Sequence, residues 1–231
     1  MPTVLLVRHG LTALTGPVLA GWTPGVHLDP RGSDQAASLG RRLAPLPLAA
    51  IVSSPLERCV ETAEAIAEGR QLQVTVEDRL GEARYGDWTG VELKRLARDP
   101  LWRAVQAHPS SVRFPGGEAL RETQARAVEA VRDWNERLGA DATYLVCSHA
   151  DVIKSLVADA VGLHLDLFQR LVIDPCSVTV VRYTELRPFL LRLNDQGGAF
   201  DDLMPRRRRS SRRRGGQTSD APVGGGSGQT G

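Results

Sequence analysis

The sequence predicts an α/β fold: a three-layer α/β/α sandwich with a mostly parallel central sheet, followed by a disordered C-terminal tail. Short apolar, β-branched runs alternate along the chain with longer segments of helical periodicity, and this order is typical of layered α/β domains. The chain has 231 residues, of which 42% are hydrophobic and 24% charged. That length and composition suit one sizeable hydrophobic core.

Six segments have the pattern of short buried strands, because their apolar and β-branched residues run up to a polar break or a turn. In chain order they are Thr3–Val7, Ala50–Ser53, Leu72–Val76, 143–149, Ser177–Tyr183 and Phe189–Leu193. The last two flank a turn signal at Glu185–Pro188, so we expect them to form a hairpin.

Five segments between the strands have helical patterns. They are Ser33–Leu43, Pro55–Ala67, Val91–Ala107, Glu118–Leu138 and Asp151–Val161. Ser33 or Asp34 could cap the first of these helices, and Pro55 suits the first position of the second. In Glu118–Leu138 the apolar residues fall on one stripe, as expected for a helix that packs on a core.

Residues 197–231 differ in composition from residues 1–196. Arginine, glycine, serine and threonine dominate the C-terminal segment, and seven arginines lie within residues 206–214. Such a segment cannot bury enough apolar surface to offset its ordering entropy, so we expect one folded domain and a disordered tail. A solvated end is the favoured interpretation of the arginines, with non-specific nucleic-acid contact as the alternative.

The sequence also bounds the environment of the protein. No stretch approaches the roughly 18 apolar residues of a membrane span, and the N-terminus lacks a basic and then apolar leader. The three cysteines, Cys59, Cys147 and Cys176, are far apart and odd in number, which favours reduced thiols and a cytoplasmic location. No Walker loop, Rossmann fingerprint or zinc pattern is present, so we expect no metal and no cofactor.

Polar side chains follow the strands where a ligand would bind. In open α/β sheets, ligands lie beyond the carboxyl ends of the strands. The first strand ends in Arg8-His9, the second leads to Arg58 in the first turn of its helix, and a later strand ends in His149. The loop after the third strand adds Glu82. We expect these five side chains to converge on one rim.

This set of side chains suits a phosphoryl group. Arginine's planar fork matches phosphate oxygens in pairs, and the helices that follow His9, Pro55 and His149 would aim N–H groups at an anion. A neutral imidazole could attack phosphorus and form a phosphohistidine, with Glu82 protonating the leaving alkoxide. Charge stabilisation by two arginines needs no metal.

The segment "LLVRHGLT" resembles the RHG signature of the histidine phosphatase superfamily, the phosphoglycerate-mutase-like proteins. Four further blocks match that family in order and spacing: "SSPLERCVETA", "LGEARYGDWTG", "FPGGEAL" and "VCSHADVI". The resemblance covers about residues 3 to 193. It implies a phosphoglycerate-mutase-like fold.

The resemblance also implies roles for single residues. His9 would be the phosphorylated nucleophile, Glu82 the proton donor, and Arg8, Arg58 and His149 would hold the phosphoryl oxygens. Thr15 stands where the family often has an asparagine that helps to bind the phosphoryl group, and it offers a shorter hydroxyl.

The chain departs from the family pattern at two further places. Leu11 replaces a glutamate that often follows the RHG motif. Ala150-Asp151 follows the second histidine, where the family usually has glycine, and Ala150 is a candidate substrate contact. Asp151 would either cap its helix or repel a second anionic group on the substrate. These departures concern the choice of substrate.

Three functions follow as hypotheses. The favoured one is a metal-independent phosphomonoester hydrolase that acts on a small phosphorylated metabolite. A phosphomutase is the alternative within the same family; the spacing of 67 residues from Glu82 to His149 is short for a glycolytic mutase, which would need to shield phosphohistidine from water. The third is an inactive scaffold whose basic tail binds nucleic acid or a partner.

Overall fold

A computed structural model describes residues 1–197 of the chain. The predicted disordered tail therefore lies outside the described residues, except for Gly197. The strands are β1 (Thr3–Arg8), β2 (Val18–Leu19), β3 (Ile51–Ser53), β4 (Val74–Val76), β5 (Val91–Glu92), β6 (Thr143–Ser148), β7 (Val178–Tyr183) and β8 (Pro188–Asp195). The helices are α1 (Pro30–Leu43), α2 (Glu57–Ala67), α3 (Leu93–Leu96), α4 (Pro100–Ala107), α5 (Leu120–Leu138) and α6 (Ala150–Val161). Four 3₁₀ turns are η1 (Asp78–Leu80), η2 (Gly86–Trp88), η3 (Pro109–Ser111) and η4 (Leu165–Arg170).

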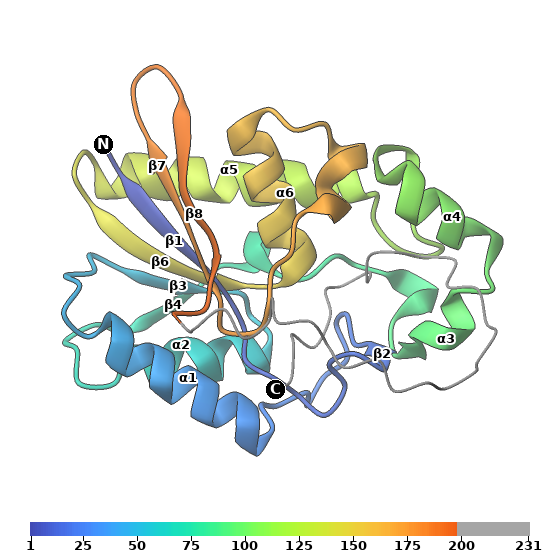
Figure 1. Cartoon of the computed structure of the whole chain (residues 1–231), viewed down its shortest axis with the longest axis horizontal. Coiled ribbons are helices and arrows are strands. Elements are labelled where there is room, and N and C mark those ends of the chain that lie inside the picture. Colours follow the sequence, from blue (N-terminus) through green and yellow to red (C-terminus); the bar gives the residue numbers. More distant parts are fainter. Residues whose placement is uncertain (198–231) are drawn as a thin grey trace, which may run out of the picture.

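Six strands form the central sheet in the order β4-β3-β6-β1-β7-β8. β4, β3, β6 and β1 pair in parallel, whereas β7 is antiparallel to both β1 and β8. Five of the six strands therefore run in one direction, and the predicted α/β fold with a mostly parallel sheet is confirmed. The β7–β8 hairpin, also predicted, projects beyond the rest of the sheet (Figure 1).

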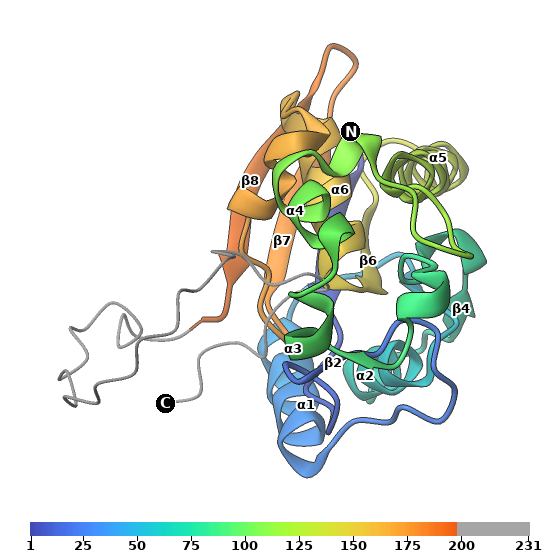
Figure 2. The same ribbon diagram turned by 90° about the vertical axis from the view of Figure 1, so that its right-hand side faces the viewer.

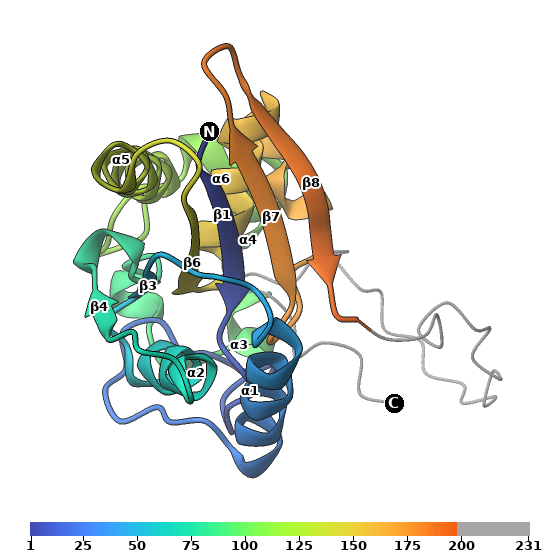
Figure 3. The same ribbon diagram turned by 90° about the vertical axis from the view of Figure 1, so that its left-hand side faces the viewer.

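Helices cover both faces of the sheet, and the strand residues alternate between the two sides. Leu5 and Val7 of β1 pack in one core cluster with residues of α1 and α2. Val4 and Leu6 of the same strand pack in a second cluster with α5 and α6. Figure 3 shows β1, β7 and β8 from the side of α1, with α1 and α2 below them.

A third hydrophobic cluster lies beside the sheet. Most of its residues belong to the segment 83–120, which we call the lid. Its interior is aromatic: the ring of Phe114 lies 4.9 Å from that of Tyr85 and 5.5 Å from that of Trp88. Trp88 in turn lies 6.2 Å from Trp102 of α4. Figures 1 and 2 show α3 and α4 of this lid at the end of the molecule that also holds β2.

The helix predicted over Val91–Ala107 is wrong, because the segment is broken into three elements. Val91–Glu92 pairs with β2 as strand β5, α3 is a single turn, and α4 starts only at Pro100. Asp99 caps α4 by accepting a hydrogen bond from the Leu101 N–H at 2.8 Å. Proline holds the preceding residue out of the helical region, so one continuous helix cannot form.

Other boundaries moved by a few residues for identifiable reasons. α1 begins at Pro30 rather than Ser33, since Asp29 is the cap and accepts from the Gly32 N–H at 2.8 Å. α2 begins at Glu57, two residues after the predicted Pro55. β2 was not predicted; two residues are too short for a periodic signal. Among the described residues, no helix is long and apolar enough to cross a membrane.

The approach of α1 to the loop after β1 gives a test of the packing. A Cβ on Gly32 would lie 2.0 Å from the carbonyl oxygen of Leu11. In a helix interior, alanine is more favourable than glycine by about 1 kcal/mol. The close contact with Leu11 outweighs that gain, so we predict that Gly32→Ala lowers the free energy of unfolding by about 1–3 kcal/mol. Urea denaturation checks it, with the exposed neighbour Ser33→Ala as control. A more stable Gly32→Ala protein would contradict the packing.

Candidate active site

Three parallel strands deliver polar residues to the same edge of the sheet. Arg8 of β1 lies in register with Ser148 of the neighbouring β6. The next residue of the first strand, His9, donates its backbone N–H to the Ser148 carbonyl at 3.0 Å, and the Ser54 N–H donates to the Cys147 carbonyl at 2.9 Å. The carboxyl ends of β1, β3 and β6 therefore meet at one place, as the sequence predicts.

The ring of His9 is held by hydrogen bonds at both nitrogens. Nδ1 lies 2.7 Å from the carbonyl oxygen of Gly10, and Arg58 Nε lies 3.3 Å from Nε2. A carbonyl only accepts and a guanidinium only donates, so Nδ1 carries the proton and Nε2 presents its lone pair. Burial lowers the pKa of His9 well below its ordinary value, and the charges of Arg58 and Arg8 lower it further.

His149 lies directly behind Arg58. Arg58 Nη2 donates to the Gly21 carbonyl at 2.9 Å and lies 3.3 Å from His149 Nδ1. The same donor argument leaves the His149 proton on Nε2, which lies 2.8 Å from the hydroxyl oxygen of Ser54. Burial, followed by the charge of Arg58, lowers the pKa of His149. Both histidines are therefore neutral, with their rings 5.3 Å apart.

Glu82 is a buried carboxyl with an altered pKa. Its Oε1 accepts the Ala83 N–H at 2.9 Å, and its Oε2 lies 3.8 Å from Nδ1 of His149. Burial raises the pKa of Glu82 to about 7, with a further contribution from the charge of Asp151. The site arginines oppose this rise without cancelling it. A carboxyl with that pKa carries a proton for part of the time at neutral pH.

The loop that carries Glu82 is fixed by one arginine of α5. Arg126 donates from Nη1 to the carbonyls of Arg79 and Gly81, at 2.7 and 2.8 Å, and from Nη2 to the Glu82 carbonyl at 2.9 Å. Glu118 accepts from the same guanidinium. These bonds hold the backbone around Glu82 in place before any ligand binds.

A small pocket, partly open to solvent, lies at these side chains. Arg8, His9, Arg58 and Glu82 line it, whereas His149 is fully buried and does not line it. Arg8 itself donates to the Ile173 carbonyl at 2.8 Å. The remaining lining residues are Thr12, Leu14, Thr15, Gly16, Val18, Leu19, Ala20, Gly21 and Tyr85.

Of the five predicted substrate contacts, the remaining two, Thr15 and Ala150, differ in position. Thr15 lines the pocket, and its hydroxyl oxygen lies 2.9 Å from that of Thr12 and accepts the Thr12 N–H at 3.0 Å. Ala150 does not line the pocket; it begins α6 and packs in the core cluster shared with α5. Gly116 and Gly117 of the block "FPGGEAL" lie against residues 84–87 and do not line the pocket.

Two structural expectations about helix starts are wrong. No helix begins directly after His9; the chain runs through a loop and β2 before α1 starts at Pro30. Asp151 does not cap α6, because His149 occupies the N-cap position. The Asp151 carboxylate instead accepts the Tyr85 hydroxyl at 3.1 Å. α2 and α6 do begin at the rim, as expected.

Among the lining residues with polar side chains, sequence reasoning missed Thr12 and Tyr85; it also missed the apolar and glycine residues of the lining. Tyr85 stands three residues after Glu82 in "GEARYG", a loop in which period-based signals are absent. Thr12 stands three residues after His9, in the block that resembles the RHG signature. Its closeness to His9 in the sequence could have indicated that it lines the pocket. Within residues 1–197, no group of three His, Cys, Asp or Glu side chains is arranged to hold a metal ion.

The fold and this set of side chains are those of an α/β protein that gathers two arginines, two histidines and a carboxyl at one edge of its sheet. The model of the histidine phosphatase superfamily (branch 1) matches residues 4–196. The chain belongs to that family, and the resemblance found in its five sequence blocks is confirmed.

Relatives and solved structures agree with the family. The chain is 34% identical over 206 residues to phosphoserine phosphatase 1 of Hydrogenobacter thermophilus, covering 84% of this chain and 92% of the relative. It is 30% identical to a probable phosphoglycerate mutase, GpmB, of Salmonella choleraesuis, in an alignment that covers 80% of this chain and 86% of the relative. It is also similar in structure to Bacillus stearothermophilus YhfR, with a TM-score of 0.77 at 29% identity. This match covers 84% of this chain and 98% of YhfR.

The raised pKa of Glu82 predicts a pH-dependent difference in stability. The ordinary value is 4.5 and the folded value is about 7, so wild type loses stability as pH rises through that window. The glutamine of Glu82→Gln cannot ionise, so the variant does not lose this stability. As pH rises from 4.5 to 8, the free energy of unfolding of the variant should therefore increase relative to that of wild type by up to about 3 kcal/mol.

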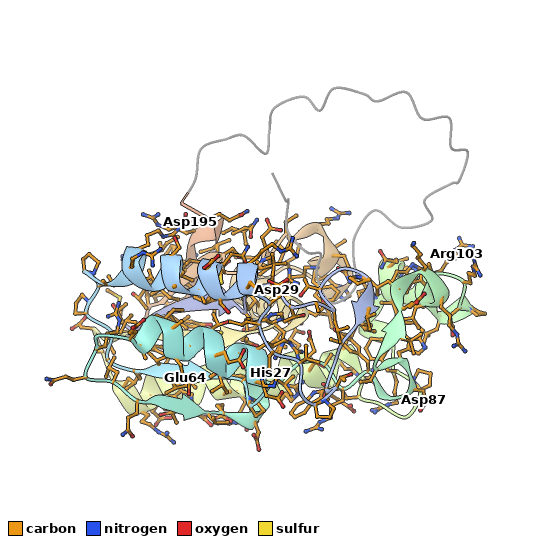
Figure 4. All side chains as sticks on the ribbon, turned by 90° about the horizontal axis from the view of Figure 1, so that it is seen from below. His27, Asp29, Glu64, Asp87, Arg103 and Asp195 are labelled. Atoms are coloured by element: carbon orange, nitrogen blue, oxygen red, sulfur yellow. The ribbon has the colours of Figure 1, made fainter. Side chains whose placement is uncertain are left out.

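Urea denaturation of both proteins across that range checks the prediction. The control is Glu64→Gln on the exposed side of α2, labelled in Figure 4. Its stability difference from wild type should stay constant with pH. A constant difference for Glu82→Gln as well would refute the raised pKa.

Proposed function

We propose that the protein is a metal-independent phosphomonoester hydrolase that acts through a phosphohistidine intermediate on a small phosphorylated metabolite. One observation carries the proposal: His9 lines the pocket, and its unprotonated Nε2 lies 3.3 Å from the guanidinium Nε of Arg58. A nucleophilic nitrogen beside a fixed cation is what attack on an anionic phosphoryl group needs, because the cation offsets the repulsion.

In the first step, Nε2 of His9 attacks phosphorus and the bond from phosphorus to the ester oxygen breaks. The leaving alkoxide takes the proton of Glu82, whose pKa of about 7 suits a general acid near neutral pH. Arg8 and Arg58 pair with the equatorial oxygens of the transferring group. The Gly10 carbonyl, on Nδ1–H, stabilises the positive charge that develops on the imidazole.

In the second step, water attacks the phosphohistidine. Its proton passes to the Glu82 carboxylate, the bond from phosphorus to nitrogen breaks, and inorganic phosphate leaves. Glu82 regains its proton and His9 its lone pair, so the cycle closes without a cofactor. His149 would orient Arg58 through the contact at its Nδ1.

The comparisons support a small substrate of this kind. The name phosphoserine phosphatase 1 describes a relative that acts on a small phosphorylated metabolite, and the alignment spans nearly all of that relative. The similarity to a probable phosphoglycerate mutase supports the second candidate, a phosphomutase. A mutase would return the phosphoryl group to the substrate, so the two candidates differ in the final acceptor: water or a substrate hydroxyl.

The prediction is that His9→Ala lowers kcat/KM for p-nitrophenyl phosphate by at least about 10³-fold, since the covalent route is lost. Turnover is measured with a chelator present, and also after truncation following Met204. The matched control is His27→Ala, because His27 is an exposed histidine that pairs with Glu61. Figure 4 shows His27 on the outer surface. The control and the truncated protein should keep wild-type turnover.

The outcomes separate the candidates. The hydrolase is supported if turnover in the presence of chelator is lost in His9→Ala and is kept in His27→Ala and in the truncated protein. No release of phosphate by wild type, with phosphoryl transfer between substrate hydroxyls, would favour the mutase. No covalent phosphorylation of wild type by any phosphomonoester, with salt-dependent binding of nucleic acid, would favour the scaffold.

A further inference from the structure

A second carboxylate is buried beneath the pocket. Asp151, in the first turn of α6, is 1% exposed. Its Oδ2 accepts the Tyr85 hydroxyl at 3.1 Å, and its Oδ1 lies 3.7 Å from Nζ of Lys154, one turn along the same helix. Lys154 in turn donates to Gln169 at 2.9 Å and is 2% exposed. Burying charged groups is costly, so such a network needs a reason beyond packing.

The network adjoins Glu82. Tyr85 lines the pocket together with Glu82, and the charges of both carboxylates act on its hydroxyl. Its ring is fixed by the edge-on contact with Phe114 in the lid. The Tyr85 O–H donates to Asp151, so Asp151 is a buried carboxylate linked through Tyr85 to the pocket that Glu82 lines. Its charge acts on Glu82 across the interior.

Two opposing sets of charges act on Glu82 from the surrounding elements. The carboxylate of Asp151 favours the protonated form of Glu82, whereas the guanidinium groups favour the ionised form. The titratable and charged groups that face this region come from β1 and the residue after it, α2, the lid, α5, β6 and α6. They are Arg8, His9, Arg58, Tyr85, Glu118, Arg126, His149, Asp151 and Lys154. Glu118 pairs with Arg126, and Asp151 is the carboxylate whose charge raises the pKa of Glu82.

We propose that Asp151, held by Tyr85 and Lys154, is a positioning residue that keeps Glu82 protonated near neutral pH. Without it, burial alone would oppose the two site arginines, and a smaller share of Glu82 would carry the proton that the alkoxide needs. Asp151 itself does not touch the pocket, so it acts through Glu82. This role rests on the proposed function for its catalytic consequence, but its effect on Glu82 does not.

The test is Asp151→Asn, which removes the charge and keeps an acceptor for the Tyr85 hydroxyl. The titration of Glu82 is followed by NMR with ¹³C-labelled glutamate, assigned by its absence in Glu82→Gln. In parallel, the pH profile of kcat/KM is measured with an alkyl phosphate. We expect the Glu82 titration and the basic limb of the profile to move down together by about one pH unit. At pH 8 this is a loss of about tenfold in rate, with little change at pH 5.

The matched control is Asp159→Asn on the same helix, because Asp159 pairs with Arg132 at the surface and lies two turns from Asp151. Its profile should match that of wild type. The double variant Asp151→Asn/Lys154→Gln avoids an unpaired buried cation, and it should show the same direction of shift. It serves where the single variant folds poorly.

The results separate the two proposals. An unmoved Glu82 titration in either folded variant would overturn the role of Asp151, whatever the activity. A shifted titration in a protein without turnover would support the role of Asp151 on Glu82 and refute the hydrolase. An equal loss of rate at every pH would assign Asp151 a structural role only, and would also overturn the proposal.

Discussion

The site depends on the position of one imidazole. The ring of His9 is fixed between the Gly10 carbonyl and the guanidinium of Arg58, and these partners together allow one neutral tautomer. Arg58 makes the same demand on His149, whose other nitrogen meets Ser54. The register of β1, β6 and β3 brings these residues together, because parallel strands end at the same edge. Most polar contacts beneath the pocket follow from that register.

Two buried carboxyls balance the cationic edge. Glu82 is held by its own loop, which Arg126 fixes through three carbonyls, and Asp151 is held from α6 through Tyr85. Under the proposed function the arginines attract a phosphoryl anion, and they also tend to ionise a nearby acid. A proton donor next to two guanidinium groups therefore requires burial or a second negative charge, and this site contains both.

Much of the fold and of the site could be predicted from the sequence. The β-branched runs and their polar ends predicted the central strands, and the same ends predicted the edge to which Arg8, His9, Arg58 and His149 converge. The break at Pro100 could have been predicted, because a proline disfavours the helical conformation in the residue before it. The two-residue strand β2 could not be predicted, because its pairing with β5 is tertiary and leaves no local periodicity. Asp151 resembled a helix cap in sequence; only the packing of Tyr85 against it shows a buried partner of the site.

The most direct measurement is the tautomer of His9, read by ¹⁵N NMR of protein labelled at histidine nitrogens and assigned with His9→Ala. The account predicts a neutral ring at pH 7 with its proton on Nδ1 and an unprotonated Nε2, since burial and Arg58 lower the pKa of His9. In Arg58→Ala the ring should take up a second proton more readily. A proton on Nε2, or an imidazolium at pH 7 in wild type, would contradict the nucleophile on which the account depends.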